Sequence, residues 1–378
     1  MYATSCIKGS RRNFAKSKEK VLSMKIHKSF RGIRFLAHDR KVSWLVAFLC
    51  LAWLVGGGTV SATTLPGPVV DTAWLAKNLD NVIVLDARKD LKSFAKEREK
   101  TAGPVNPCGP GGKKAKKPVR GNGHIPGAVL VNLKKIFSGY KLNGKAVKVM
   151  LPKKENFEKL MQRSGVSKDS AVVITGKGEK LANIAFMTRL YWTMKYFGFD
   201  NVAILNGGTV QWKLDKHNVE YGRSRKPKKG NFTVSVERKE ILASMENVSA
   251  LSQGEGKEQI LDVRAKPFYL GLTYRRKFQS PKSKGHIPTA KSFPAAFLVD
   301  TAAPSTMLYN KEDIEKVAAL SGIDLIDTPT VTSCHTGVKA SLAWFVLSEI
   351  LENKSVRVYD GSMHEWSIAG KPVTRPID

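Results

Sequence analysis

Short runs of apolar residues alternate along most of the chain with segments whose apolar positions recur at helical spacing. The apolar runs of the first half lie at 81–87, 128–132, 171–175 and 201–205, and the helix-like segments at 155–165, 181–198 and 207–214. Continuous apolar runs of this length are typical of strands that are buried on both faces. The pattern predicts an α/β fold in which helices cover both faces of a mostly parallel sheet.

The second half repeats this order of elements. Predicted strands lie at 258–264, 291–295, 328–333 and 355–360, and predicted helices at 311–322, 338–353 and 361–370. Three motifs return in the same order: Asp86-Ala87-Arg88 as Asp262-Val263-Arg264, GHIP at 123–126 as GHIP at 285–288, and LNGG…W at 205–212 as YDGS…W at 359–366. An ordered set of repeated motifs indicates a duplicated domain. We predict a first domain at 67–220, a linker at 221–235 and a second domain at 236–378.

A basic segment precedes an uncharged apolar run near the N-terminus. Residues 1–62 hold 12 of the 63 Lys and Arg residues, and the apolar run covers 44–55. Twelve residues are short for a membrane core of about 30 Å, and the small residues Val60 and Ala62 fit a signal-peptidase site. We expect cleavage after Ala62 and export to the periplasm. The alternative is an inner-membrane anchor formed by residues 44–55.

The overall composition excludes several classes of protein. The 378 residues include 42% hydrophobic residues, which excludes a disordered chain. Four cysteines cannot form a disulfide framework in a chain of this length, and no spaced Cys/His set indicates structural zinc. Cleavage at the expected site would remove Cys6 and Cys50 and leave Cys108 and Cys334. Each remaining thiol must therefore be judged by its own surroundings.

Cys334 stands between the predicted strand 328–333 and the predicted helix 338–353. Ligands of parallel α/β sheets bind beyond the carboxyl ends of the strands, and N–H groups at a helix start favour a thiolate and bind anions. Gly337 frees the loop backbone, and Lys339 adds a cation. A lone cysteine is more often a buried, inert residue. The position, the glycine and the helix start together favour a nucleophile.

The motifs in this order resemble the two-domain rhodanese family of thiosulfate and 3-mercaptopyruvate sulfurtransferases. The DxR, GHIP[GT]A and CxxGx[KR]A motifs and the tryptophan-ending motif cover residues 67–375, and CHTGVKASLAW is most similar to the exported bacterial branch. The resemblance implies tandem rhodanese-like domains and a persulfide on Cys334. It implies that the loop residues bind the substrate: His335, Thr336, Gly337, Val338 and Lys339. No metal, nucleotide or flavin cofactor is needed.

The resemblance also guides the comparison of the two repeats. Matching VVIT to VTSC puts Thr175 where Cys334 stands, and the first copy of the family usually lacks the cysteine. We therefore predict one site per chain. The substrate-binding arginine of the family falls at Phe268 or a neighbour in AKPFYLG of this chain. Arg275 and Arg276, followed by Lys277, are the candidates to supply its charge, although such a basic run is more often a solvated surface.

The expected reaction moves a sulfane sulfur from a small anionic donor through Cys334 to cyanide or a thiol. Thiosulfate is favoured over 3-mercaptopyruvate as the donor. A different class of function remains open, namely a non-catalytic persulfide carrier, sensor or binding module for a protein partner. Cysteine phosphatases of related fold have an arginine six residues after the cysteine, where this chain has Ala340.

The strong positive charge raises the question of a polyanionic partner. The formal net charge is +31, but the basic loops carry no recognised nucleic-acid motif. We expect no nucleic-acid partner, and weak association with anionic membrane surfaces as a side effect. The two Asp/Arg pairs of the DxR motifs are expected to be structural, and the GHIP histidines to bond within their turns.

Overall fold

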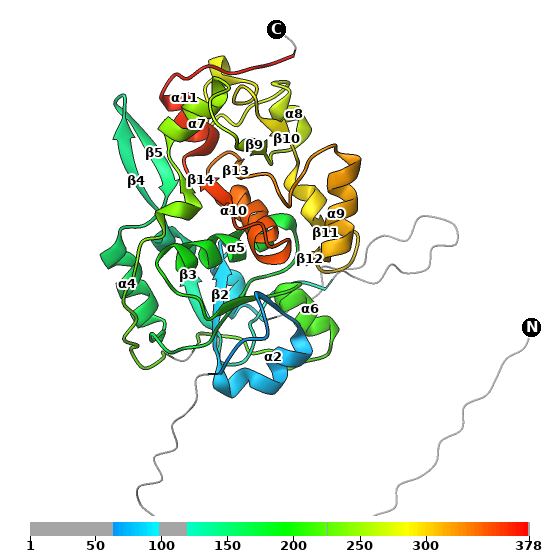
Figure 1. Ribbon diagram of the computed structural model, residues 1–378. Coiled ribbons are helices and arrows are strands. Elements are labelled where there is room, and N and C mark those ends of the chain that lie inside the picture. Colours follow the sequence, from blue (N-terminus) through cyan, green and yellow to red (C-terminus); the bar gives the residue numbers. More distant parts are fainter. Residues whose placement is uncertain (1–62, 98–118, 225, 377–378) are drawn as a thin grey trace, which may run out of the picture. The chain divides into compact units, whose positions relative to one another are not determined.

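The structure is a computed structural model that describes residues 63–97, 119–224 and 226–376 (Figure 1). The predicted signal segment 1–62 and the insert that contains Cys108 lie outside the described residues. In the described ranges no helix is both long and apolar enough to cross a membrane. Cleavage, the anchor alternative and the role of Cys108 therefore stay predictions.

The first repeat is built around a five-stranded sheet whose pairings are all parallel. In spatial order its strands are β1 (Val69–Val70), β7 (Val202–Leu205), β6 (Val172–Thr175), β2 (Ile83–Arg88) and β3 (Val129–Asn132). Most of these residues are β-branched or otherwise apolar, which suits strands packed on both faces. The four strands predicted from the apolar runs are confirmed. The edge strand β1 was not predicted.

The second repeat contains a matching parallel sheet. Its strands, in the corresponding spatial order, are β8 (Leu242–Ala243), β14 (Val356–Tyr359), β13 (Thr330–Ser333), β9 (Gln259–Asp262) and β10 (Lys291–Ser292). Thus β13 is the equivalent of β6, and β14 is the equivalent of β7. The shared strand order confirms the predicted duplication and the α/β class.

Helices follow the strands in both repeats. The first repeat has α2 (Thr72–Asn78), α3 (Lys92–Ala95), α4 (Lys154–Arg163), α5 (Leu181–Tyr196) and α6 (Gly208–Leu214). The second has α7 (Met245–Ser252), α8 (Lys266–Tyr269), α9 (Lys311–Leu320), α10 (Val338–Phe345) and α11 (Ser362–Ile368). Side chains of Asp71, Ser244 and Asn310 cap α2, α7 and α9, and each accepts a backbone N–H of the first turn.

Short 3₁₀ turns connect several of these elements. They cover Leu79–Asn81, Leu133–Ile136, Lys239–Ile241, Pro281–Ser283 and Ala295–Leu298. The predicted strand 291–295 is shorter than expected because Pro294 precedes the last of these turns. The predicted helix 338–353 is α10 continued by a π-helical turn at Val346–Ile350.

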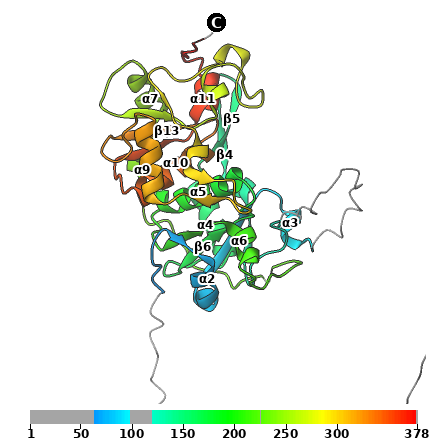
Figure 2. The same ribbon diagram turned by 90° about the vertical axis from the view of Figure 1, so that its right-hand side faces the viewer.

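Helices cover both faces of each sheet, as Figure 2 shows from the side. In β6, Val172 and Ile174 belong to the same apolar cluster as α4 and α5, whereas Val173 belongs to a second cluster with α2 and α6. In β13, Val331 packs in a third cluster with residues of α7 and α11. The first cluster contains the inner faces of both repeats. One continuous core therefore joins them.

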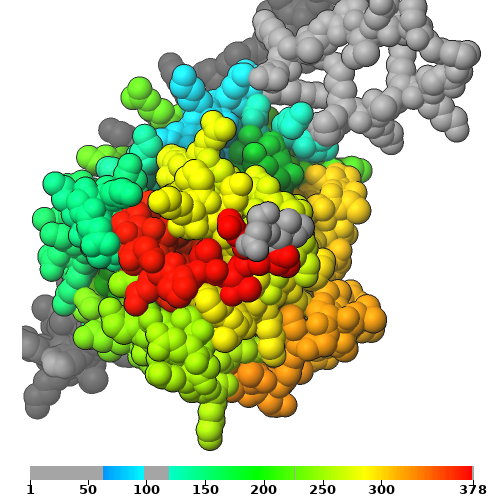
Figure 3. Space-filling model, turned by 90° about the horizontal axis from the view of Figure 1, so that it is seen from above, coloured from blue at the N-terminus to red at the C-terminus, as the bar shows by residue number. Residues whose placement is uncertain are grey.

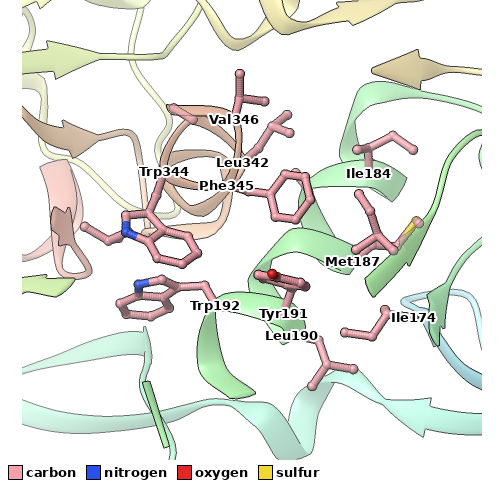
Figure 4. Packing of buried hydrophobic residues seen from close by; sticks show 14 of the residues in the cluster. Ile174, Ile184, Met187, Leu190, Tyr191, Trp192, Leu342, Trp344, Phe345 and Val346 are labelled. Atoms are coloured by element: carbon pink, nitrogen blue, oxygen red, sulfur yellow. The ribbon is translucent and has the colours of Figure 1, made fainter. Parts of the chain in front are cut away.

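The centre of this core is the packing of α5 against α10 (Figure 4). The ring of Tyr191 meets that of Phe345 edge-on, with centroids 4.7 Å apart. The Tyr191 hydroxyl donates to Glu349 at 2.7 Å, and burial followed by this carboxylate raises the pKa of Tyr191 well above its ordinary value. Because α10 follows the Cys334 loop directly, this packing fixes the helix that carries the loop.

Each repeat also contains an antiparallel hairpin that the sequence pattern did not reveal. The first is β4 (Ser138–Leu142) with β5 (Lys145–Met150), and the second is β11 (Val299–Asp300) with β12 (Met307–Leu308). Each hairpin contacts the other repeat. In Figure 3, teal residues from the β4–β5 region border the red C-terminal part of the chain, which includes α11.

The repeated motifs occupy equivalent positions. Asp86 pairs with Arg88 and Asp262 with Arg264, so the expected structural ion pairs are confirmed. His124 Nδ1 bonds to the carbonyl of Ile125 at 3.1 Å, within its own turn as expected. The prediction is wrong for His286, whose Nδ1 bonds to the carbonyl of Tyr269 at 2.8 Å because that ring stacks on the imidazole.

The segment between the repeats lies against the first one. Residues 226–238 contain no helix or strand. The N–H of Phe232 donates to Val166 at 3.1 Å, and the N–H of Val234 donates to Glu158 at 2.8 Å. The predicted boundaries of the linker stay predictions.

Candidate active site

Cys334 lies at the carboxyl end of β13, the central strand of the second sheet. The strand places it at the edge where ligands of parallel sheets bind. Its side chain is buried, with 2% of the residue exposed, and it is the only cysteine among residues 63–97, 119–224 and 226–376. The predicted order of strand, cysteine and helix is therefore present.

The loop backbone directs one N–H group, that of Thr336, toward the sulfur. Gly337, with φ of 75°, caps α10, and the N–H of Thr336 donates to Cys334 Sγ at 3.5 Å. The loop carbonyls turn the other way, since those of Cys334 and His335 accept from the first N–H groups of α11 at 3.1 and 3.0 Å. This polarity suits an anionic sulfur at Cys334.

Ser362, which sequence reasoning missed, supports the loop from beneath. Its Oγ accepts the N–H of Cys334 at 3.0 Å and that of Gly337 at 3.1 Å. The hydroxyl donates to the carbonyl of Tyr359 at 2.8 Å and lies 4.0 Å from Sγ. Ser362 has a φ of 49°, a value that residues other than glycine rarely adopt. The sequence repeat could have pointed to this residue, because the equivalent position in the first copy is Gly208.

Arg264, whose expected role is structural only, also lies beside the loop. Its Nε and Nη2 donate to Asp262, and Nη2 also donates to the carbonyl of Gly285 at 2.7 Å. Its Nη1 is buried and has no hydrogen-bond partner among the described residues. The equivalent Nη1 of Arg88 donates to Ser93 and Gly121. Of the two DxR arginines, only Arg264 thus keeps a guanidinium N–H without a partner among the described residues.

His335 is buried beside this guanidinium. Asp262 pairs in register with Ser333, which brings Arg264 next to His335 two residues further on. The ring of Phe268 meets the imidazole edge-on at 4.7 Å, and Nδ1 has no partner among the described residues. Burial first, and then the charges of Arg264, Arg275 and Lys339, lower the pKa of His335 to about 3. His335 is therefore neutral near pH 7.

The remaining predicted residues differ in their placement. Thr336 and Gly337 are buried in the loop, and Val338 and Lys339 form the first turn of α10, partly exposed. Arg275 is exposed, stacks on Phe278 at 5.3 Å, and lies near enough to affect His335. Arg276 is exposed and has no polar partner in the described part of the chain. The structure thus brings Arg275, but not Arg276, toward the loop.

The equivalent loop of the first repeat contains no thiol. Asp86 pairs with Thr175 in register, as Asp262 pairs with Ser333, so Gly176 takes the place of Cys334. The alignment that put Thr175 there is wrong by one residue. It matched the two strand sequences by similarity, whereas the pairing of each strand with its DxR neighbour fixes which residues are equivalent. In this loop Lys177 pairs with Glu179 at 3.1 Å, and a side chain on Gly178 would collide with Gly207.

The fold and the loop define a tandem α/β protein whose second repeat places a buried cysteine between a strand and a helix. The rhodanese-like domain model matches residues 71–215 and 244–369. The chain therefore belongs to the rhodanese family and, with its relatives, to the sulfurtransferases.

Similar proteins carry names for several roles. A Mycobacterium leprae protein named for thiosulfate sulfurtransfer is 33% identical, over 68% of this chain and 80% of its own length. The 3-mercaptopyruvate sulfurtransferase of Escherichia coli is 25% identical, over 82% and 98%. The Escherichia coli SseA crystal structure, titled for the rhodanese fold of 3-mercaptopyruvate sulfotransferases, has a TM-score of 0.58 and 26% identity, over 78% of this chain and 98% of that one.

Proposed function

We propose that the protein transfers a sulfane sulfur from thiosulfate, in preference to 3-mercaptopyruvate, through a persulfide on Cys334. The observation that carries the proposal is the loop geometry. A buried cysteine at a strand end receives the N–H of Thr336, and Gly337 caps the helix that follows. Such a site stabilises the anionic forms of sulfur.

In the first half-reaction the Cys334 thiolate attacks the outer sulfur of thiosulfate. A new S–S bond forms, the bond between the two thiosulfate sulfurs breaks, and sulfite leaves with the electron pair. The product is the persulfide anion Cys334–S–S⁻. The N–H of Thr336 is directed at the Cys334 sulfur and can stabilise the negative charge of the persulfide, and the loop carbonyls are kept away by their hydrogen bonds to α11.

In the second half-reaction cyanide or a thiolate attacks the outer sulfur of the persulfide. The S–S bond breaks, Cys334 leaves as thiolate, and thiocyanate or a new persulfide is released. No net oxidation occurs at the protein over the cycle. The two steps form a ping-pong sequence through a covalent intermediate.

Cations around the loop support an anionic donor. Arg264 Nη1 is buried and has no hydrogen-bond partner among the described residues, and Lys339 lies in the first turn of α10. Arg275 adds an exposed charge near His335. A doubly charged donor gains more from these cations than a singly charged one does. The proposal therefore favours thiosulfate, and the ratio of kcat/KM for the two donors tests it.

The decisive experiment is turnover of thiosulfate and cyanide by the purified protein. Thiocyanate production that depends on Cys334 supports the enzyme, and Cys334→Ser provides the control. A protein that accepts one sulfur per chain but does not turn over supports a persulfide carrier instead. That second candidate is favoured by similarity to the sulfur carrier protein TtuD of Thermus thermophilus, 32% identical over 67% of this chain and 86% of its own length.

The proposal also covers where the protein works and which molecules it meets there. We propose periplasmic export, a small anionic donor, a thiol or cyanide acceptor and no nucleic-acid partner. Weak attraction to anionic membranes follows from the positive net charge, which is +31 for the full sequence and +21 without residues 1–62, where 12 Lys/Arg and 2 Asp/Glu contribute +10. N-terminal sequencing of native protein tests the export: a start near Thr63 supports it, and intact residues 1–62 in the membrane fraction support the anchor.

A further inference from the structure

We infer that Arg189, a residue of the repeat without a thiol, is a positioning residue for the Cys334 loop of the other repeat. It acts by neutralising Asp360, whose carboxylate lies beneath that loop. The inference rests on the proposed role of Cys334 as the sulfur nucleophile. It assigns to the first repeat a specific part in the chemistry of the second.

Arg189 lies in the middle of α5 and is completely buried. Its Nη1 donates to Asp360 Oδ1, which is also buried. The guanidinium lies over the rings of Phe137 and Trp192, at 5.3 and 4.8 Å, while Nε and Nη2 have no partner among the described residues. Asp360 is therefore the only carboxylate seen paired with this buried charge in the described part of the chain.

Asp360 connects this arginine to the thiol loop. It follows β14 directly and precedes the turn that contains Ser362. Ser362 Oγ in turn accepts the N–H groups of Cys334 and Gly337. A side chain on Gly337 would collide with Asp360 and would place its Cβ 2.8 Å from Arg189 Nη1. The ion pair thus touches the underside of the loop.

The first repeat serves as an internal control for this arrangement. Asn206 follows β7 just as Asp360 follows β14. Asn206 Oδ1 accepts the N–H of Leu308 at 2.9 Å, and Asp360 Oδ2 accepts the N–H of Leu151 at 2.7 Å. A neutral asparagine is therefore enough to hold the hairpin of the opposite repeat. The Arg189–Asp360 ion pair is present only beneath the loop that contains a thiol.

Neutralising Arg189 and neutralising Asp360 should have opposite effects on the pH midpoint of Cys334 alkylation. An unpaired carboxylate beneath the loop disfavours a second negative charge on Cys334, whereas an unpaired guanidinium favours it. In Arg189→Gln, the pH midpoint of Cys334 alkylation should rise by about half a unit. In Asp360→Asn, it should fall by a similar amount. A purely structural role would loosen the loop in both variants and shift both midpoints in one direction.

The test measures the alkylation rate of Cys334 by iodoacetamide against pH in the full chain. The double variant Arg189→Gln/Asp360→Asn reproduces the neutral arrangement of the first repeat and should return the midpoint to the wild-type value. Arg189→Lys should stay near wild type because it keeps the charge. Arg238→Gln, which removes an ion pair with Asp200 elsewhere, is the matched control and should have no effect. The other groups around the loop are unchanged in all these variants: Asp262, Arg264, Arg275, His335, Lys339 and His364.

Removing one partner of a buried pair can prevent folding, so the melting temperature of each variant is measured first. If Arg189→Gln does not fold, Asp360→Asn and the double variant decide the question, since they differ only at Arg189. The pH midpoint of Cys334 alkylation must be lower than wild type in Asp360→Asn and must return to the wild-type value in the double variant. Equal midpoints in these two, or shifts of the same sign in both single variants, would overturn the inference. Alkylation needs no sulfur donor, so failure of the proposed function is seen separately as absent thiosulfate turnover.

Discussion

Gly208 and Ser362 occupy the same position in the two repeats, and both have positive φ, 58° and 49°. The backbone conformation there is a property of the duplicated fold, which glycine adopts without strain. The second repeat places a serine at this position despite the strain. Its hydroxyl bonds to the N–H groups of Cys334 and Gly337. The strain is therefore found in the repeat that contains the thiol.

Replacing Ser362 should lower both stability and activity, and the backbone strain should set the size of the stability loss. Ser362→Gly relieves the strain but leaves the buried N–H groups of Cys334 and Gly337 without their acceptor, so we expect a loss of about 1–2 kcal/mol in the free energy of unfolding. Thiosulfate turnover should fall about tenfold or more, because the loop loses two hydrogen bonds. Ser362→Ala keeps the strained Cβ and should lose both stability and activity. Thermal unfolding and turnover measure the two effects, and full activity in both variants would show that the hydroxyl is not needed.

Persulfide formation should occur at one position per chain. Gly176 replaces the cysteine in the first repeat, so thiosulfate treatment should add one sulfur, about 32 Da, to the peptide that contains Cys334. Cys334→Ser should carry no added sulfur and show no transfer. Peptide mass spectrometry makes the measurement. Equal labelling of Cys108 would mean that exposure alone, and not the loop, controls reactivity.

Local order along the chain was enough to predict the fold class and the strand, loop and helix that surround Cys334. Strand, cysteine, glycine and helix follow one another within a dozen residues around Cys334, and the motifs appear twice. Contacts between distant residues were not predictable in this way. Ser362 lies 28 residues from Cys334, and Arg189 lies 171 residues from Asp360. Only the folded register brings these pairs together.

The same limit explains the one-residue error in aligning the two loops. The apolar runs 171–175 and 328–333 can be matched in more than one way by composition alone. Pairing of each strand with its DxR neighbour settles the choice and sets Gly176 against Cys334. The edge strand β1 was missed because it has only two residues. The hairpin β4–β5 was missed because much of its surface is polar and exposed.

Lys339 should contribute to the rate of persulfide formation through its charge. It lies in the first turn of α10, five residues after Cys334, and is one of the cations that affect His335. Lys339→Ala should slow persulfide formation about ten- to a hundredfold, a loss of roughly 1–3 kcal/mol in transition-state stabilisation. Lys339→Arg should keep much of the activity, since the charge remains. Single-turnover rates with thiosulfate make the measurement; an unchanged rate in the alanine variant would leave the loop N–H groups as the activators.

His335 should make the protein less stable in acid. Its pKa is lowered to about 3 in the folded state, mainly by burial, against about 6.5 in an unfolded chain. Between these values the unfolded state binds the proton and the folded state does not, so the free energy of unfolding falls as the pH drops from about 6.5 toward 3. The expected slope from this residue is about 1 kcal/mol per pH unit.

The comparison of wild type with His335→Gln isolates this slope. The pKa values of His286 and His364 are also lowered, chiefly by burial, so these residues add to the acid sensitivity of both proteins equally. Urea unfolding at pH 7.5, 6 and 5 should show wild type losing stability more steeply than the variant. At pH 7.5 the effect of protonation is absent, and any difference there reports packing against Phe268. Parallel curves down to pH 5 would mean that His335 is protonated in the folded protein, contrary to its burial among three cations.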